Sequence, residues 1–521
     1  MGVGAVEQVW SFITGAMDSI TQFSSSRLYV DVHQTAGVRL AISVGLPLLV
    51  LAGVYYWFTL SPWSTKSSKS GLQLPPGNRW MLPLIGETLQ LAVDVDYFVT
   101  SRVQRYGEVF SSHLFGGPTV VVTNVEAIKH VLASPNQKNF ISLLPPTIRP
   151  HFGPQSVNQI PAGTLLHANL RRLFQGRTKA ENVSGLISTV DDVVKATLNS
   201  WAERRTLKAY PELKKVAFHI ALVLIYGEYT PGSEEMEICY KNFDNFLKGV
   251  TSLPINLPGT PLNKALKAVK IINDLTDRVM HKLKGTKADD HAIDADGLLG
   301  DLMNLSIPEE GITGLTRTQI LDNVRVALNA AYEPSSAALT WLLKFLAENP
   351  DDLQEIIEEH KAIADSKGSK EYKLTYEDTL RMPASSRAFL ETNRVVVPNF
   401  GVTRLVINDE ELNGKLIPKG WTVIIPFRPT LHNPKYYPDP RKFNPSRFKT
   451  SPPQPGIFLP FGYGPRICPG GDLAKAQAHV FLHRLVLGYR WELLGNSNEV
   501  AVAPVPLPRG HLLIRVTRIE E

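Results

Sequence analysis

Long apolar stretches with few interruptions run through the chain and predict buried helices. Apolar residues fill most of 319–348 and of 472–490, and both stretches are too long for ordinary strands. A third apolar stretch, 215–226, predicts another core helix. By contrast, 282–318 is rich in charges and contains several glycines, which predicts a solvated connection with one short helix near 298–305. We therefore expect a core built from long helices.

Apolar and β-branched residues indicate a hairpin in the first third of the chain. They flank Gly116-Gly117-Pro118 within 108–124, so we expect two paired strands with the turn at those three residues. The next segment, 140–163, contains several prolines and little periodicity, which predicts an irregular loop.

An uncharged segment near the N-terminus predicts a membrane anchor. No charged residue occurs from 40 to 65, and 40–62 is long enough to cross a bilayer as one helix. Tyr55, Tyr56 and Trp57 lie toward one end of it, as side chains at a membrane interface do. A buried hairpin helix is the alternative interpretation of this segment.

The remaining sequence predicts one large domain behind a hinge. The prolines of 63–88 predict a stiff spacer, and we assign no role to 1–39. Residues 89–521 contain no proline- or serine-rich linker and no internal repeat, so we expect a single domain there. Hydrophobic residues make up 43% of the sequence, which is enough for a sizeable core.

Charge and cysteine content narrow the range of functions. The net charge of +6 is modest for 521 residues, and no basic block with interleaved aromatic residues indicates nucleic-acid binding. The excess positive charge is compatible with an anionic membrane surface or an acidic redox partner. Two cysteines cannot form a disulfide framework, which favours a reducing compartment.

One of these cysteines, Cys468, lies in the glycine-rich stretch 458–472. A soft metal ligand beneath a flat cofactor needs a loop with few side chains, and Gly462 is one of the glycines that supply such access. Arg466 lies close enough in sequence to reach an acidic group on the cofactor, and a helix that begins after Cys468 would stabilise a thiolate. A small buried cysteine in a glycine-rich turn is the alternative.

The spacing Phe461-x-x-Gly464-x-Arg466-x-Cys468-x-Gly470 resembles the haem-binding signature of the cytochrome P450 family at every fixed position. The resemblance implies that Cys468 binds the iron of haem b as a thiolate. It also implies that Arg466 contacts a haem propionate and that Phe461 and Gly462 belong to the haem-binding loop. The fold it implies is mainly α with a small β region, preceded here by one transmembrane helix.

The segment containing His167 and Arg171 lies where family members have an aromatic residue or histidine four residues before an arginine. Positions four apart share one face of a helix, so both side chains can approach the same propionate. The resemblance therefore implies that His167 and Arg171 bind haem. An exposed amphipathic pair is the alternative.

In the 319–348 stretch the chain departs from the family pattern. Family members have (Ala/Gly)-Gly-x-(Asp/Glu)-Thr-(Thr/Ser), whereas this sequence has Ala331 for the glycine and Pro334 for the threonine. The family threonine assists proton delivery during oxygen activation, and proline has neither a hydroxyl nor an N–H. We expect a bend at Pro334, with Glu333 as the remaining acid and Ser335 as the nearest hydroxyl.

Glu391 and Arg394 have the spacing of a helical ion pair, and Arg447 follows at the distance that the family uses for a buried Glu/Arg/Arg cluster. The resemblance implies that this cluster fixes the loop beneath the haem. Taken alone, Glu391 and Arg394 would be an ordinary surface pair.

The function that the resemblance implies is insertion of one oxygen atom from O2 into an apolar substrate. Electrons would come from NADPH through NADPH cytochrome P450 reductase, with the chain in the endoplasmic reticulum membrane as a single-pass protein and its catalytic domain in the cytosol. The prolines of the hinge and Leu257-Pro258-Gly259-Thr260 resemble plant members that oxidise terpenoids and steroids, which favours a diterpenoid, triterpenoid or steroid substrate. Pro334 leaves two alternatives open: a haem-thiolate isomerase or dehydratase that does not use O2, and a non-catalytic haem-bound sterol or hormone binder.

Overall fold

The computed structural model divides the chain into two compact units, each described here by itself. The first unit comprises 1–127, 138–141 and 403–425, and the second comprises 128–137, 142–402 and 426–521. The residues that the structure describes are 53, 71–78, 86–133, 138–144, 148–227, 234–250, 252, 255–285, 296–368, 372–495, 500–501 and 505–519.

The predicted anchor at 40–62 falls almost wholly outside the described residues, as do large parts of the hinge at 63–88. Among the helices of the described ranges, none combines the length and apolar character that crossing a bilayer requires. The anchor therefore stays a prediction.

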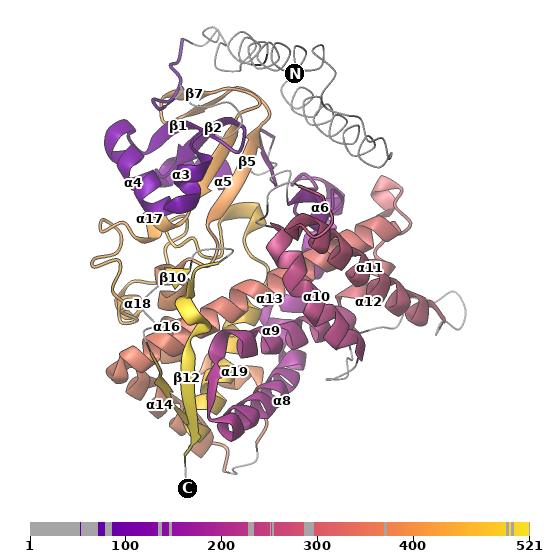
Figure 1. The fold of residues 1–521 in the computed structure, drawn as a ribbon, viewed down its shortest axis with the longest axis vertical. Coiled ribbons are helices and arrows are strands. Elements are labelled where there is room, and N and C mark those ends of the chain that lie inside the picture. Colours follow the sequence, from indigo (N-terminus) through magenta and orange to yellow (C-terminus); the bar gives the residue numbers. More distant parts are fainter. Residues whose placement is uncertain are drawn as a thin grey trace, which may run out of the picture. The chain divides into compact units, whose positions relative to one another are not determined.

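A five-stranded sheet forms the centre of the first unit, with strand order β1-β2-β8-β5-β3 (Figure 1). Its strands are β1 (Val109–Leu114), β2 (Gly117–Val122), β8 (Thr422–Pro426), β5 (Gly401–Val406) and β3 (Phe140–Ser142). Buried β-branched residues of β2 pair in parallel with β8, with Val120 opposite Val423. The remaining elements of this part are α3 (Thr88–Val93), α4 (Val95–Tyr106), α5 (Val125–Ala133, which continues into the second unit), β6 (Glu410–Leu412) and β7 (Lys415–Ile417).

The predicted hairpin at 108–124 is confirmed, but its turn lies earlier than expected. Leu114 pairs with Gly117, so the turn consists of Phe115 and Gly116. Both have positive φ, 53° and 81°, as the tight two-residue turn of a hairpin requires. Gly117 and Pro118 belong to β2 instead, because the positive φ at Phe115 reverses the chain one residue sooner.

Helices make up most of the second unit, which confirms the predicted mainly α fold with a small β region. These helices are α6 (Arg149–Phe152), α7 (Leu165–Thr178), α8 (Ala180–Arg204), α9 (Ala209–Tyr226), α10 (Glu234–Val250), α11 (Pro261–Gly285), α12 (Leu298–Asn304), η2 (Pro308–Glu310), α13 (Arg317–Glu348), α14 (Pro350–Asp365), α15 (Tyr376–Leu380), α16 (Pro383–Val396), α17 (Arg428–Leu431), α18 (Arg447–Thr450), η3 (Gly464–Arg466), α19 (Gly471–Gly488) and η4 (Arg509–His511). Its strands are β4 (Thr206–Lys208), β9 (Tyr489–Leu493), β10 (Val500–Ala501), β11 (Leu507–Pro508) and β12 (Leu513–Arg518).

The helices predicted from apolar stretches are all present. The stretches 319–348, 472–490 and 215–226 form α13, α19 and most of α9, and the short helix near 298–305 is α12. The segment 140–163 is less irregular than predicted, because β3 and α6 occur within it. Both are too short to give a periodic signal in the sequence.

The long helix α13 runs through the centre of the second unit and packs against α9 and α16 (Figure 1). It begins with a capping box in which Thr316 and Gln319 satisfy each other's backbone N–H groups. Leu328 in its first half belongs to one apolar cluster, and Leu342 in its second half belongs to another. The helix therefore joins two parts of the core, and the stretch between them includes Pro334.

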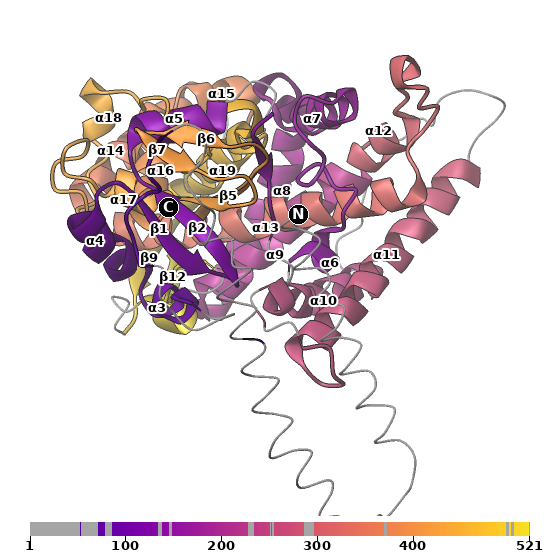
Figure 2. The ribbon, with the colours of Figure 1, turned by 90° about the horizontal axis from the view of Figure 1, so that it is seen from above.

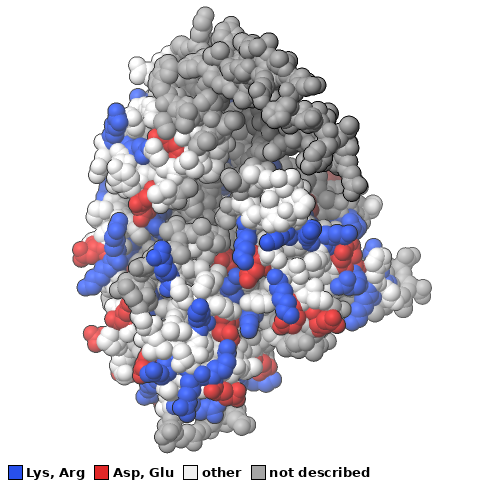
Figure 3. Space-filling view, in the orientation of Figure 1, with Lys and Arg blue, Asp and Glu red and all other residues white. Residues whose placement is uncertain are grey.

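The helices α10 and α11 lie side by side, as Figure 2 shows from a second direction. Phe243 and Phe246 of α10 stack with ring centroids 5.1 Å apart and belong to the same apolar cluster as Leu328. On the face drawn in Figure 3, basic and acidic side chains of the described residues are interspersed.

Candidate functional site

The backbone around Cys468 folds back on itself within the second unit. The N–H of Cys468 donates to the carbonyl of Phe461 at 2.7 Å, which closes the loop between them. Gly464 has φ +76°, and a Cβ there would lie 2.2 Å from the carbonyl oxygen of Leu132. Gly462 has φ +78°. These conformations and the close approach explain why glycines stand at both positions.

Two opposing effects act on the thiol of Cys468. The residue is open to solvent on one side, but protein surrounds the thiol on the others, and this burial raises its pKa. The N–H of Gly470 and the positive charge of Arg171 oppose that rise. Because α19 begins at Gly471, its positive end also lies beside the sulfur. Cys468 therefore has the neighbours that favour a thiolate once a cation binds it.

His167 and Arg171 are one turn apart on α7, as predicted. Arg171 Nη2 donates to the carbonyl of Ile467 at 2.6 Å, so the arginine contacts the cysteine loop directly. His167 is buried, and its Nε2 has no hydrogen-bond partner among the described residues. Burial and then the charges of Arg466 and Arg171 lower the pKa of His167 to about 4. This histidine is therefore neutral at pH 7 and lies close to both arginines.

Arg466 has a set of partners that the sequence did not indicate. Its guanidinium donates to the carbonyls of Val157 at 3.1 Å, Asn158 at 3.3 Å and Ile160 at 2.5 Å. These carbonyls belong to the segment after α6, far from Arg466 in sequence. Motif spacing carries no information on such backbone partners, so the sequence alone gave no signal for them.

The donors gathered beside Cys468 fit the cofactor that the sequence implied. Haem carries two carboxylates, and this part of the chain offers the Arg171 and Arg466 guanidinium groups and the unpaired Nε2 of His167. A buried ring nitrogen without a partner is costly, so a ligand that pairs with it stabilises the site. The thiol supplies the soft ligand that haem iron accepts. Phe461 is half-buried and fixes the loop through its carbonyl.

Glu333 points toward α9 and makes contacts within a buried polar cluster. It accepts a hydrogen bond from the Tyr210 hydroxyl at 2.5 Å, and its other oxygen lies 3.9 Å from Lys214 Nζ. Lys214 in turn pairs with Asp244 at 2.5 Å. Burial raises the pKa of Glu333, while Lys214 and Tyr210 oppose that rise. Tyr210, Lys214 and Asp244 were missed by sequence reasoning, because they come from helices α9 and α10.

The helix α13 continues through Pro334 as a single helix. Ala330 and Pro334, which share one face, are exposed although most of the helix on either side is buried. Ser335 is half-buried. Glu333, one position before Pro334, is buried, so it lies on a different face of α13 from the exposed Ala330 and Pro334.

The predicted cluster of Glu391, Arg394 and Arg447 is confirmed. The carboxylate of Glu391 accepts from Arg394 at 2.8 Å and from Arg447 at 2.9 Å, and the side chains of Glu391 and Arg394 are fully buried. Arg394 also donates to the carbonyls of Leu431 and Pro440, which ties α16 to the segment before α18.

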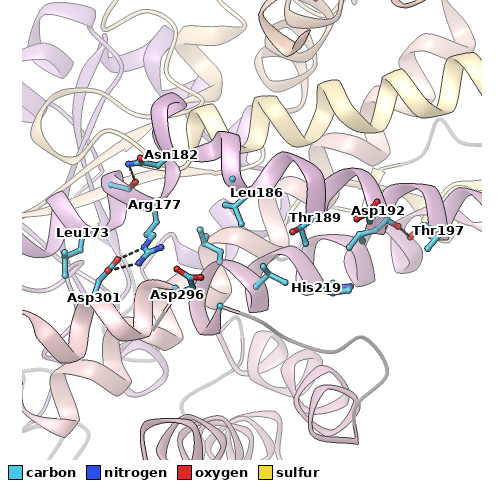
Figure 4. A pocket seen from close by; sticks show the side chains of 18 of the residues that line it. Leu173, Arg177, Asn182, Leu186, Thr189, Asp192, Thr197, His219, Asp296 and Asp301 are labelled. Atoms are coloured by element: carbon cyan, nitrogen blue, oxygen red, sulfur yellow. Dashed lines mark hydrogen bonds and ion pairs between the residues drawn. The ribbon is translucent and has the colours of Figure 1, made fainter. Parts of the chain in front are cut away.

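A separate pocket of about 1130 Å³ lies between α7, α8 and α9 (Figure 4). Arg177 and Asp301, which line it, pair with each other through two hydrogen bonds of 2.6 and 2.8 Å. His219 also lines the pocket and is buried. Cys468 and Glu333 are absent from its lining, so we place the chemistry at the cysteine loop and not here.

Comparisons with known proteins agree with this geometry. The family model for cytochrome P450 matches residues 75–506. An abscisic acid 8′-hydroxylase of Solanum lycopersicum is 36% identical over 90% of this chain and 96% of its own length. Abscisic acid 8′-hydroxylase 2 of Arabidopsis thaliana is 33% identical over 88% of this chain and 92% of its own. A cyanobacterial cytochrome P450 solved with retinoic acid bound has a TM-score of 0.76 and 26% identity, covering 86% of this chain and 100% of that one.

The family uses haem b and electrons that NADPH supplies through a reductase. The family model covers nearly all of the described residues, including the cysteine loop, α7 and α13. The chain belongs to the cytochrome P450 family and is a monooxygenase of that family.

Proposed function

We propose that this monooxygenase oxidises an apolar isoprenoid-derived substrate, with haem held by the cysteine loop and α7. The observation that carries the proposal is the gathering of His167, Arg171 and Arg466 beside the thiol of Cys468. Cys468 would bind the iron as a thiolate, and the three side chains would hold the haem carboxylates through their nitrogen donors. Gly462 and Phe461 keep the loop close to the cofactor.

Haem supplies the oxygen-activating chemistry, and the chain's residues supply orientation and protons. We propose that Glu333 feeds protons to the site, with Ser335 as the nearest hydroxyl in place of the missing threonine. The neighbours of Glu333 support this role: Lys214 connects its carboxyl group to Asp244, which is about half exposed at 48%. A proton can therefore enter from solvent through groups that lie within a few ångströms of one another.

The substrate is inferred from the relatives and from the sequence. The plant relatives are named as abscisic acid 8′-hydroxylases, so their substrate is abscisic acid. At 36% and 33% identity, members of one enzyme family can act on different substrates, so we propose a wider class than abscisic acid alone. It includes abscisic acid together with the diterpenoids, triterpenoids and steroids that the hinge and the 257–260 segment favour.

We further propose that the chain docks NADPH cytochrome P450 reductase at the endoplasmic reticulum membrane. The uncharged segment 40–62 supports an anchor, and the stiff segment 63–88 would hold the catalytic part close to the bilayer on the cytosolic side.

Expression with a reductase tests the proposal. The reduced wild-type protein with CO should give the red-shifted absorption band of thiolate-bound haem, and Cys468→Ser should lose that band while retaining helical circular dichroism. Abscisic acid, a diterpenoid, a triterpenoid and a steroid are then supplied, and oxidised products are read by mass spectrometry. Retention of the band by Cys468→Ser would contradict the ligand assignment.

Pro334, in place of the family threonine, is the observation behind the isomerase alternative, whereas the family model and the hydroxylase relatives favour the monooxygenase. The distinguishing result for the isomerase is product at full rate without NADPH and O2, whereas oxygenation requires both and adds one oxygen atom to the product mass.

A further inference from the structure

A row of buried polar side chains lies in the first half of α13. Asp322, Asn323 and Arg325 are only 2%, 0% and 4% exposed, in a helix that otherwise buries mainly apolar residues. Burying ionic and amide groups is costly unless each has partners, and apolar side chains of similar size would pack at least as well. The partners of this row therefore indicate what it does.

The row holds the backbone of one segment, 151–160, which follows and includes the end of α6. Asp322 Oδ2 accepts the N–H of Gln155 at 2.9 Å, and Asn323 Oδ1 accepts the N–H of Val157 at 2.9 Å. Asn323 Nδ2 also donates to the carbonyl of Gln155 at 3.3 Å. Side chains of α13 thus replace the strand or helix partners that a buried backbone segment needs.

Two further contacts fix the near end of the segment. Arg325 Nε donates to the carbonyl of His151 at 2.8 Å, and the Arg325 guanidinium also pairs with Asp322. Gly153 has φ +76°, and a Cβ at that position would lie 2.1 Å from the Asp322 carboxyl group. The segment therefore approaches α13 as closely as a residue without a side chain permits.

The far end of the same segment holds Arg466. The carbonyls of Val157, Asn158 and Ile160 each accept a hydrogen bond from the Arg466 guanidinium. Val157 thus uses its N–H to bond Asn323 and its carbonyl to bond Arg466. One peptide segment connects a buried amide of α13 with the arginine of the cysteine loop.

We propose that Asn323, with Asp322, is a positioning residue that fixes the Arg466 guanidinium through the 151–160 segment, and so sets how firmly the cofactor is held. The inference rests on the proposed function, in which Arg466 holds a haem carboxylate. Neither Asn323 nor Asp322 contacts the cysteine loop itself in the hydrogen bonds described above. The connection from them to the cofactor site that these hydrogen bonds trace runs through the 151–160 segment to Arg466.

The rate of haem transfer from the full-length oxidised protein to excess apomyoglobin measures this effect without any substrate or turnover. Asn323→Leu keeps the volume but removes the bonds to Gln155 and Val157, so haem loss should become about tenfold faster. Asn323→Asp keeps an acceptor for the Val157 N–H and should give an intermediate rate. Thr340→Val is the matched control, because Thr340 is fully buried on the same helix and its hydroxyl donates to the Ser336 carbonyl of that helix.

A double-mutant cycle separates positioning from general destabilisation. Arg466→Gln should speed haem loss, and adding Asn323→Leu to it should change the rate by less than about twofold, because the two residues act in series. Thermal unfolding of the haem-free variants measures the stability that each substitution costs. Asn323→Leu should unfold at a lower temperature than Thr340→Val, because it leaves the Val157 N–H without its partner, so the cycle and not the unfolding temperature identifies positioning.

Several results would overturn the inference. They are a rate for Asn323→Leu no greater than that of Thr340→Val, an undiminished effect of Asn323→Leu in the Arg466→Gln background, or normal haem retention by Arg466→Gln. The last of these also removes Arg466 from the cofactor site but leaves Cys468 in place. A wild-type protein without the thiolate CO band would refute the proposed function itself.

Discussion

Glu333 is a buried carboxyl group that is only partly compensated by its neighbours. Tyr210 donates to one oxygen, but the other has no hydrogen-bond partner among the described residues, and Lys214 lies 3.9 Å away. A carboxyl group with one unpaired oxygen in a buried place can exchange protons with water or substrate that enters the site. The unpaired oxygen lowers the stability of the fold but leaves a position at which a proton can be exchanged.

Replacement of Glu333 should uncouple NADPH use from product formation. Glu333→Gln keeps the volume and the contact with Tyr210 but cannot carry a proton, so product per NADPH should fall by about tenfold or more, with peroxide rising in parallel. Haem content should stay normal. An unchanged ratio of product to NADPH in Glu333→Gln would contradict the proposed proton supply.

Pro334→Thr provides the comparison, because it returns the family hydroxyl next to Glu333. Its product per NADPH should change without loss of haem, since Pro334 lies on the open face of α13 and not in the cysteine loop.

The residues of the site differ in how far the sequence could predict them. Cys468, Phe461 and Gly462 could be identified because one short loop fixes their spacing, and the loop closes through local hydrogen bonds. The partners of Glu333 and Arg466 could not, because Tyr210, Lys214 and the 157–160 carbonyls come from distant parts of the chain. A local sequence pattern does not show which distant segments meet when the chain folds, or which of their residues pair.

The Glu391 cluster joins α16 to the segment that precedes α18, so its loss should affect the fold before the chemistry. Glu391→Ala strands two arginines, one of them fully buried, at a cost of about 3 to 5 kcal/mol. We expect this variant to lose haem incorporation, as read from the CO band, and to unfold at lower urea concentration.

Glu355→Ala is the matched control for that variant. Glu355 also pairs with two basic residues, Arg387 and Lys449, but its side chain is 42% exposed. Its loss should cost less than about 1 kcal/mol. If Glu391→Ala bound haem normally and lost only turnover, the structural role of the cluster would be wrong.

A buried pair of histidines links α14 and α19 and should make the fold sensitive to acid. His360 Nδ1 and His483 Nδ1 lie 2.9 Å apart. Burial lowers the pKa of His360 to about 2 and that of His483 to about 4. Between these values and the ordinary pKa near 6.5, the unfolded chain binds protons that the folded chain does not. The two histidines therefore cost the fold nothing above pH 6.5, and the free energy of unfolding decreases as the pH falls below that value.

Urea unfolding at pH 7.5, 6.5 and 5.5 measures this dependence. Each of the two histidines should lower the free energy of unfolding by about 1.4 kcal/mol at pH 5.5 relative to pH 7.5. A His360→Gln, His483→Gln double variant should show a flatter dependence on pH, even if it is less stable throughout. An equal slope in the double variant and the wild type would exclude this pair as the origin.

At the scale of the whole molecule, apolar stretches were sufficient to locate the main helices but not the division of the described chain into two units. The stretches that became α9, α13 and α19 are long enough to show one period clearly. The five-stranded sheet was not predicted, because β8 and β5 come from far along the sequence and pair with β2 and β3 only in the fold. Such pairings depend on tertiary contacts that a local pattern does not record.

The orientation of the chain in the membrane can be tested with two sites already present in it. Asn182 and Asn304 each lie in an Asn-x-Ser sequence, and both side chains are exposed in the structure. Exposed acceptors of this kind are available for glycosylation if they enter the lumen. Because we propose that 40–62 anchors the chain with its catalytic part in the cytosol, both asparagines should remain unmodified, and protease added to sealed microsomes should digest the catalytic part. A chain redirected into the lumen by a cleavable signal peptide is the control that shows whether these sites accept a glycan. Glycan on Asn182 or Asn304 of the natural chain, or protection of the catalytic part from protease, would place it in the lumen, where a cytosolic reductase could not supply its electrons.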